Sequence, residues 1–115
     1  MRICIHRGSR EIGGTCIEVE AQGHRLVLEV GLPLDTLDTE GLLPPIAGFR
    51  ETDETLLGLV ISHPHQDHYG LAKYLRPEPP VFMGAAARRI LEAATIFTPG
   101  GVTFPKAFET WNLFK

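Results

Sequence analysis

The sequence is poor in residues that several protein classes depend on. Only two of its 115 residues are cysteines, Cys4 and Cys16, and they do not form a CxxC pair. A disulfide-stabilised secreted domain contains more cysteines than this, and a thiolate metal site needs them closer together. The two cysteines could lie on paired strands, but we interpret both as small buried hydrophobic residues.

Long apolar runs are also missing. No stretch approaches the ~20 apolar residues that a transmembrane helix needs, and the N-terminus lacks the apolar core of a signal peptide. We therefore expect a cytoplasmic protein with no membrane partner. Hydrophobic residues make up 43% of the chain and charged residues 22%, which is ordinary for a globular protein. The length predicts a single domain spanning residues 1–115.

The sequence has no excess of basic charge. Its formal net charge is −3, and residues 32–56 carry six acidic side chains against one base, Arg50. The other residues sum to about +2, from ten Lys or Arg against eight Asp or Glu, and they show no basic stripe. The composition therefore does not favour a nucleic-acid partner. We interpret the acidic segment as solvated surface instead of a cation site.

The first thirty residues predict an antiparallel meander, because apolar residues alternate along three segments that short connections separate. In the third segment we expect Leu26, Leu28 and Val30 to face the core. Residues 32–52 are rich in proline and glycine but also contain large apolar side chains, which indicates a packed flap instead of a linker. The predicted strands are residues 2–6, 15–20 and 24–30.

The remaining residues alternate between helical and strand patterns. The predicted elements are a helical turn at residues 53–57, a buried strand at 56–61, a helix at 71–75, a strand at 81–83 and a helix at 85–97. The apolar face of the last helix contains Ala87, Ile90, Leu91, Ala94 and Phe97. The aromatic tail that ends at Lys115 has no clear period and could be a strand that lacks a partner.

The segment Ser-His-Pro-His-Gln-Asp-His-Tyr-Gly follows the buried strand directly and contains the strongest motif of the chain. Its ligand-type residues have the spacing H-x-H-x-D-H. In open α/β sheets, chemistry is usually placed at the carboxyl ends of strands, where this segment is expected to lie. The motif residues are His63, His65, Asp67 and His68.

This spacing suits a metal centre. His63 and His65 are two residues apart and can converge on one metal ion, whereas Asp67 and His68 face a neighbouring position. The motif would then supply two ligands to each of two sites, and Asp67 would have a catalytic role in holding a metal-bound water. Imidazole and carboxylate suit Zn²⁺ first, then Fe or Mn. The alternatives are an incidental group of surface histidines and histidines that are catalytic without a metal.

The His motif, with Leu-Leu-Gly-Leu-Val-Ile before it, resembles the second motif of the metallo-β-lactamase superfamily. The stretch HRGSREIGGTCIEVEAQGHRLVLEVGLPLD is similar to the N-terminal strands of its ribonuclease J-like and β-CASP-like members. The resemblance covers about residues 3–98. It implies an α/β (α+β) fold that forms half of an αββα four-layer sandwich, with a mixed, mostly antiparallel sheet and helices on one face. It also implies that His63, His65, Asp67 and His68 are metal ligands, with two zinc sites in the parent family.

The chain departs from the family pattern at its first motif. Where the family has Asp at the end of the third strand, this chain has Glu29. That carboxylate ordinarily supports the His loop through hydrogen bonds. The extra methylene of Glu29 changes its reach, and an altered support weakens metal affinity by about 10–100-fold. We expect Glu29 to contact the loop; an ordinary strand glutamate is the alternative.

A second departure concerns the rest of the ligand set. The family takes a His, a bridging Asp and a second His from its C-terminal half, but no His or Asp follows His68 here. We therefore expect the N-terminal half of a metallo-hydrolase of phosphodiesters or esters, left by truncation or a frameshift and inactive alone. The alternative is a non-catalytic homodimer, paired through the sheet edge and the aromatic tail, with a shared or half-occupied metal site. A nucleic-acid-binding module is a weaker third hypothesis, supported by the resemblance only.

Overall fold

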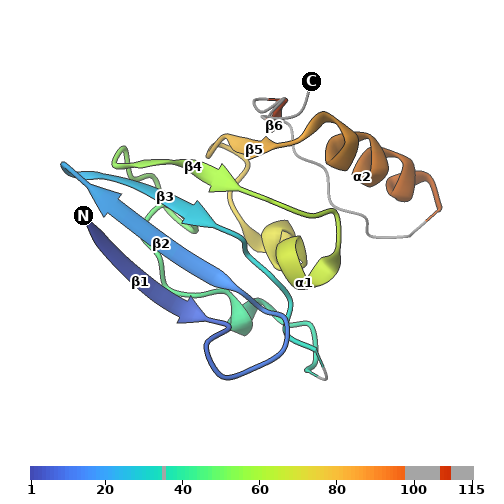
Figure 1. Ribbon diagram of the computed structural model, residues 1–115, viewed down its shortest axis with the longest axis horizontal. Helices are drawn as coiled ribbons and strands as arrows, with labels where there is room; N and C mark the ends of the chain where they lie inside the picture. The colour runs from blue at the N-terminus through green and yellow to red at the C-terminus, as the bar shows by residue number, and fades with distance from the viewer. Residues whose placement is uncertain (35, 98–106, 110–115) are drawn as a thin grey trace.

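Figure 1 shows the computed structural model of the chain, which describes residues 1–34, 36–97 and 107–109. Within these residues, six strands form one sheet in the order β1-β2-β3-β4-β5-β6, so neighbours in sequence are neighbours in space. The strands are β1 (Arg2–Arg7), β2 (Cys16–Ala21), β3 (His24–Leu28), β4 (Leu56–Val60), β5 (Val81–Met83) and β6 (Ala107–Glu109). The helices are α1 (Gln66–Tyr69) and α2 (Ala85–Phe97), with 3₁₀ turns η1 (Glu40–Leu42) and η2 (Ala72–Tyr74).

The sheet is mixed, and the predicted α/β (α+β) class is confirmed. Strands β1, β2 and β3 form the expected antiparallel meander. Strands β3 to β6 pair in parallel, so antiparallel pairing does not dominate the sheet as expected. The reason is that the connections after β3, β4 and β5 are long enough to cross over, which parallel pairing requires. The arrangement is compatible with half of an αββα sandwich.

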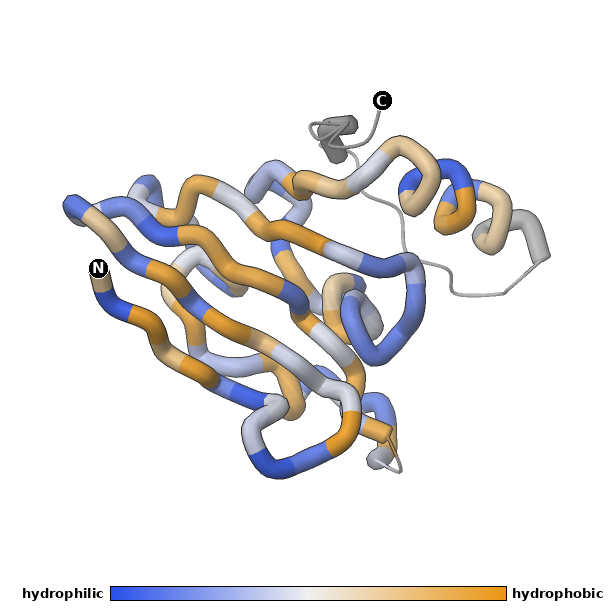
Figure 2. The backbone as a smooth tube through the Cα atoms, viewed as in Figure 1, coloured by the Kyte–Doolittle hydropathy of each residue, from blue (hydrophilic) through white to orange (hydrophobic). Residues whose placement is uncertain are grey.

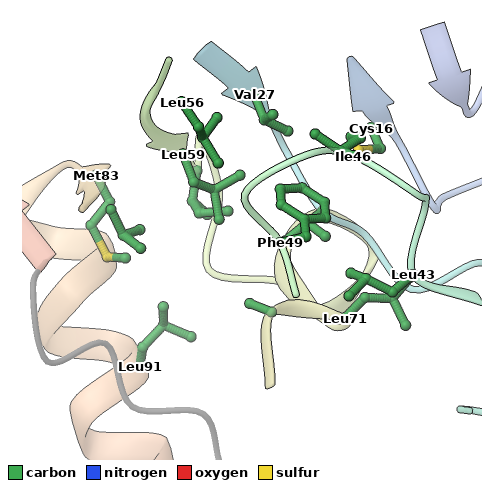
Figure 3. Close-up of a cluster of buried hydrophobic side chains, with 14 residues drawn as sticks. Cys16, Val27, Leu43, Ile46, Phe49, Leu56, Leu59, Leu71, Met83 and Leu91 are labelled. Carbon is green, nitrogen blue, oxygen red and sulfur yellow. The ribbon is translucent and has the colours of Figure 1, made fainter. Parts of the chain in front are cut away.

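One face of the sheet carries the hydrophobic core. Val27, Leu59 and Met83 extend from neighbouring strands of this face and are fully buried or nearly so, at 0%, 1% and 0% exposure. Leu71, which follows α1, and Leu91 of α2 belong to the same buried cluster, as Figure 3 shows. Both helical segments thus pack on this side of the sheet. The flap also contributes to the cluster, through Leu43, Ile46 and Phe49.

The structure corrects the predicted core face of β3. Leu26 and Leu28 lie on the opposite face and are half-buried, because the buried Val27 alternates with them along the strand. Val30 is buried as expected. In α2, Leu91 is buried but Ile90 is 54% exposed, so the apolar face of this helix is narrower than predicted.

Other predicted details also change. At residues 53–57 the expected helical turn is absent: residues 54 and 55 form a turn, and β4 begins at Leu56. The helix expected at 71–75 is replaced by α1 and η2. Cys16 is buried, but Cys4 is exposed, because the outermost strand β1 has no covering layer there. In the tail, β6 pairs with β5, and the other residues beyond 97 lie outside the described part. No helix of the described residues is long and apolar enough to cross a membrane.

The flap is attached to the rest of the fold by polar contacts as well as by its core residues. The buried guanidinium of Arg25 donates a hydrogen bond to the carbonyl of Ala47 at 2.8 Å. Lys73 pairs with Asp38, and this hydrogen bond is the main reason that the pKa of Asp38 lies below its usual value. These contacts hold residues 36–52 against β3 and η2.

Candidate metal centre

The His motif lies at the carboxyl edge of the parallel strands. The buried Ile61 follows β4 and donates a backbone hydrogen bond to Phe82 of β5 at 2.9 Å, which fixes the end of β4 in the sheet. The chain then turns through residues 62–65 into α1, whose first turn carries Asp67 and His68. The motif therefore lies on an exposed turn whose two ends are anchored by a strand and a helix.

The structure brings the predicted ligand residues together. The ring of His63 lies 4.8 Å from that of His68 and 6.3 Å from that of His65, measured between centroids. His68 Nε2 is 3.5 Å from a carboxylate oxygen of Asp67. However, within the described ranges no three His, Cys, Asp or Glu side chains converge as a metal ion requires. The four side chains form a group of neighbours without forming a closed ligand shell.

Glu29 contacts both ends of this turn. It follows β3 with a left-handed backbone, at φ 66°, and its side chain is only 10% exposed. One carboxylate oxygen, Oε1, accepts a hydrogen bond from the Ser62 amide at 2.9 Å. The other, Oε2, lies 3.3 Å from Nδ1 of His68. The longer side chain of glutamate thus reaches both Ser62 and the imidazole from the adjacent strand.

The contact between Glu29 and His68 has a chemical consequence. Oε2 and Nδ1 are close enough for an ion pair but are not aligned for a hydrogen bond, and neither buried atom has another hydrogen-bond partner among the described residues. A small rotation would let a protonated Nδ1 donate to Oε2. That tautomer leaves the lone pair of Nε2 free, which is how a carboxylate prepares a histidine for metal ligation.

Two backbone hydrogen bonds attach α1 to the segment after β3, and the sequence did not predict them. We call this pair of bonds the clasp. The amides of Val30 and Leu32 donate hydrogen bonds to the carbonyls of His68 and Gln66, at 3.0 and 2.9 Å. The segment after β3 thus runs alongside α1, and Gly31 lies between the two bonded residues. A Cβ atom at Gly31 would lie 1.8 Å from the carbonyl oxygen of Asp67. In the sequence, Gly31 was the one sign of this close approach, but by itself it indicated only the end of a strand.

We call His63, His65, Asp67 and His68 the His group. The two histidines of the N-terminal meander, His6 and His24, lie outside it. His24 is exposed at the start of β3. His6 contacts Glu18 through Nε2 at 2.8 Å, and Glu18 also accepts a 2.8 Å hydrogen bond from Arg25. Burial alone would raise the pKa of Glu18, but the hydrogen bonds from Arg25 and His6 outweigh it, and the pKa is lowered. This network supports the sheet and the flap and is not part of the His group.

The residues present fit zinc by their chemistry. Three imidazoles and a carboxylate are typical zinc donors. The contact between Glu29 and His68 is the kind of carboxylate support that a ligating histidine has. When bound at such a site, zinc lowers the pKa of a coordinated water and supplies a Lewis acid. The His group provides an incomplete version of that site, since its donors do not converge.

Comparisons with known proteins give partial matches. No family model matches the chain. Ribonuclease J from Synechocystis is 36% identical over 70 residues, which are 58% of this chain and 11% of that protein. An RNase J-like protein from Methanocaldococcus jannaschii is 32% identical over 71 residues, 62% of this chain and 15% of that protein. The transcription termination factor FttA from Methanothermobacter thermautotrophicus is 27% identical over 93 residues, 78% of this chain and 15% of that protein.

A solved structure confirms that the fold occurs in a larger protein. A protein of unknown function from Enterococcus faecalis V583 matches 96% of this chain with a TM-score of 0.71, at 21% identity and over 31% of its own length. The chain spans 11–15% of the length of the curated relatives described above. The partial matches to ribonuclease J support the resemblance to the metallo-β-lactamase superfamily.

Proposed function

We propose that this chain is the N-terminal part of a metal-dependent hydrolase of the metallo-β-lactamase superfamily, related to ribonuclease J. The observation that supports this most is the position of the His motif, on the turn after a parallel strand with the buried carboxylate of Glu29 against it. The relatives named ribonuclease J agree with this function. We expect the protein to act in the cytoplasm.

The proposed substrate is a phosphodiester, because the matched relatives include ribonucleases. The broader proposal is that the protein hydrolyses an ester by the same chemistry. The charge of the chain does not add support for RNA, since the formal net charge is −3.

The described residues have separate roles in this proposal. His63, His65 and His68 would hold zinc, with Mn or Fe as alternatives, and Asp67 would add a carboxylate and orient a bound water. Glu29 would act as a positioning residue, by fixing the tautomer of His68 and by holding the Ser62 amide. The clasp at Gly31 would keep α1, and therefore Asp67 and His68, at a fixed distance from the sheet.

The ligand set is incomplete, and further donors would come from another segment or another chain. Two facts support this part of the proposal. No His or Asp follows His68 in the sequence. Within the described residues, no three potential donors converge. The 115-residue chain alone should therefore bind zinc weakly and should not turn over a phosphodiester.

A zinc titration tests the proposed site. Zinc is added to the metal-free chain in competition with a chromophoric chelator, and the affinity is compared among three proteins. We expect measurable binding by the wild type, loss of binding in the His63→Ala/His65→Ala double variant, and no change in His24→Ala. His24 is a suitable control because it is an exposed histidine of the same chain that lies outside the His group.

The outcomes that contradict the proposal are specific. Zinc binding that survives the double substitution would move the site elsewhere, and a wild type that binds no zinc would remove the metal centre. A second measurement uses a chromogenic phosphodiester. Turnover by a verified monomer of the 115-residue chain would overturn the inference that ligands are missing.

A further inference from the structure

Ser62 contacts Glu29 and His63 through different groups. Its backbone amide donates a hydrogen bond to Oε1 of Glu29, and its hydroxyl oxygen lies 2.9 Å from Nδ1 of His63. Figure 2 shows the turn that follows the hydrophobic stretch of β4 as a hydrophilic segment. Ser62 is exposed, so its side chain does not fill space in the core. The hydroxyl group therefore contacts a proposed ligand without having a packing role.

The backbone of Ser62 is held by two strands. The preceding residue, Ile61, is fully buried and donates a backbone hydrogen bond to β5. The amide of Glu29 donates a hydrogen bond to the carbonyl of Val60 at 2.9 Å, so Glu29 is bonded to the chain on both sides of Ile61. These bonds leave mainly the side-chain rotation of Ser62 free. A hydroxyl on a fixed backbone loses little conformational entropy when it forms a hydrogen bond with His63.

The rings of His63 and His68 are supported at the same nitrogen. Nδ1 of His63 lies against the hydroxyl of Ser62. Nδ1 of His68 lies 3.3 Å from Oε2 of Glu29. The two rings are stacked, with an angle of 29° between their planes. Within the described part of the chain, Nε2 of His63 has no hydrogen-bond partner, so this nitrogen is the one available to a ligand.

The contact between Ser62 and His63 can select one of two tautomers. If the hydroxyl oxygen accepts a hydrogen bond from Nδ1, Nε2 keeps a lone pair that a metal ion can use. If the hydroxyl donates to Nδ1, Nε2 carries the proton and cannot bind a metal ion. Because Ser62 is exposed, its hydroxyl can donate to water while its oxygen accepts from Nδ1. The first arrangement therefore satisfies every polar group of the contact.

We propose that Ser62 is a positioning residue for His63: its hydroxyl oxygen accepts a hydrogen bond from Nδ1 and so keeps Nε2 unprotonated for zinc. This inference rests on the proposed function, because it concerns the same site. Glu29 then supports two rings, His68 directly and His63 through Ser62. The ring of His65 has no hydrogen bond within the described residues, so the hydroxyl should affect only one of the three histidines.

Nuclear magnetic resonance of the metal-free chain tests the tautomer directly. Long-range ¹H–¹⁵N spectra at about pH 8.5 distinguish a proton on Nδ1 from a proton on Nε2 in a neutral imidazole. In the wild type we expect His63 to carry its proton on Nδ1. In Ser62→Ala the ratio of the Nδ1–H to the Nε2–H tautomer should fall by about 2–5-fold, the net effect of one exposed hydrogen bond. His24 and His65 should not change.

The choice of variants separates the hydroxyl from other effects. Ser62→Ala keeps the backbone amide, so the hydrogen bond to Glu29 remains and only the hydroxyl is lost. Ser62→Thr provides a hydroxyl again and should restore the tautomer of His63, since an exposed position has room for a methyl group. Ser9→Ala is the matched control, because Ser9 is the only other serine of the sequence and is also exposed. It should leave every tautomer unchanged.

Zinc titration against the chromophoric chelator measures the consequence for the metal. Ser62→Ala should bind zinc about 10-fold more weakly than the wild type, and Ser62→Thr should bind it as the wild type does. A wild-type His63 with its proton on Nε2 would overturn the inference. So would a Ser62→Ala variant with unchanged tautomer and zinc affinity, or a loss that Ser62→Thr does not restore. If the tautomers follow the expected pattern but the wild type binds no zinc, the proposed function fails, whereas the action of Ser62 on His63 is confirmed.

Discussion

Replacing Gly31 with alanine should separate α1 from the sheet. The added Cβ would lie 1.8 Å from the carbonyl oxygen of Asp67, whereas real Cβ atoms essentially never come closer than 3.0 Å to a heavy atom. The obstacle is backbone, so no side-chain rotation relieves it. Either α1 or the segment after β3 must move by about 1 Å, and the movement is centred on the proposed ligands.

The contacts around Gly31 set the expected loss of unfolding free energy in Gly31→Ala. The movement breaks or weakens two backbone hydrogen bonds, from Val30 to His68 and from Leu32 to Gln66. Each contributes about 1 kcal/mol, and overpacking of this kind adds about 1–3 kcal/mol. We expect the free energy of unfolding to fall by about 3–5 kcal/mol, which is a large part of the ~5–15 kcal/mol that domains have. Zinc affinity should fall with it, because Asp67 and His68 are displaced.

Urea unfolding followed by circular dichroism measures this loss. Gly41→Ala is the matched control, because a Cβ atom at Gly41 would have only Thr39 Oγ1 near it, at 3.9 Å. That variant should stay within about 0.5 kcal/mol of the wild type. If Gly31→Ala unfolds at the same urea concentration as Gly41→Ala, the clasp does not hold α1 as described.

Three further predictions concern other parts of the chain. Since the pKa of Glu18 is lowered in the folded state, its stabilising effect is complete above the usual value of 4.5 and is lost as the pH falls through the folded value. Wild-type stability should therefore decrease more than that of Glu18→Gln between about pH 6 and pH 3, and equal acid sensitivity would refute this. Burial raises the pKa of Cys16 to about 12, whereas Cys4 is exposed, so mass spectrometry should find one alkylated cysteine in the native chain at about pH 8 and two after unfolding. Rapid double alkylation of the native chain would contradict that burial. Finally, Glu29→Ala should weaken zinc binding by about 10–100-fold, and an unchanged affinity would show that the His68 contact has no role.

The sequence by itself determined strands β1 to β5, the long helix and the His motif. These features depend on local patterns: alternation along β1 to β3, the apolar run of β4, and the spacing of His63, His65, Asp67 and His68. The apolar side chains of the flap also indicated a packed segment, and Phe49 is buried at 1% exposure.

Tertiary structure decided which face of the sheet became the core. Leu26 and Leu28 are apolar, as Val27 is, so alternation defined two faces without showing which one the flap and helices would cover. The close approach of Gly31 to Asp67 and the reach of Glu29 to Ser62 and His68 likewise join segments more than thirty residues apart. Local patterns contain no information about such distances, because these depend on how separate elements pack against one another.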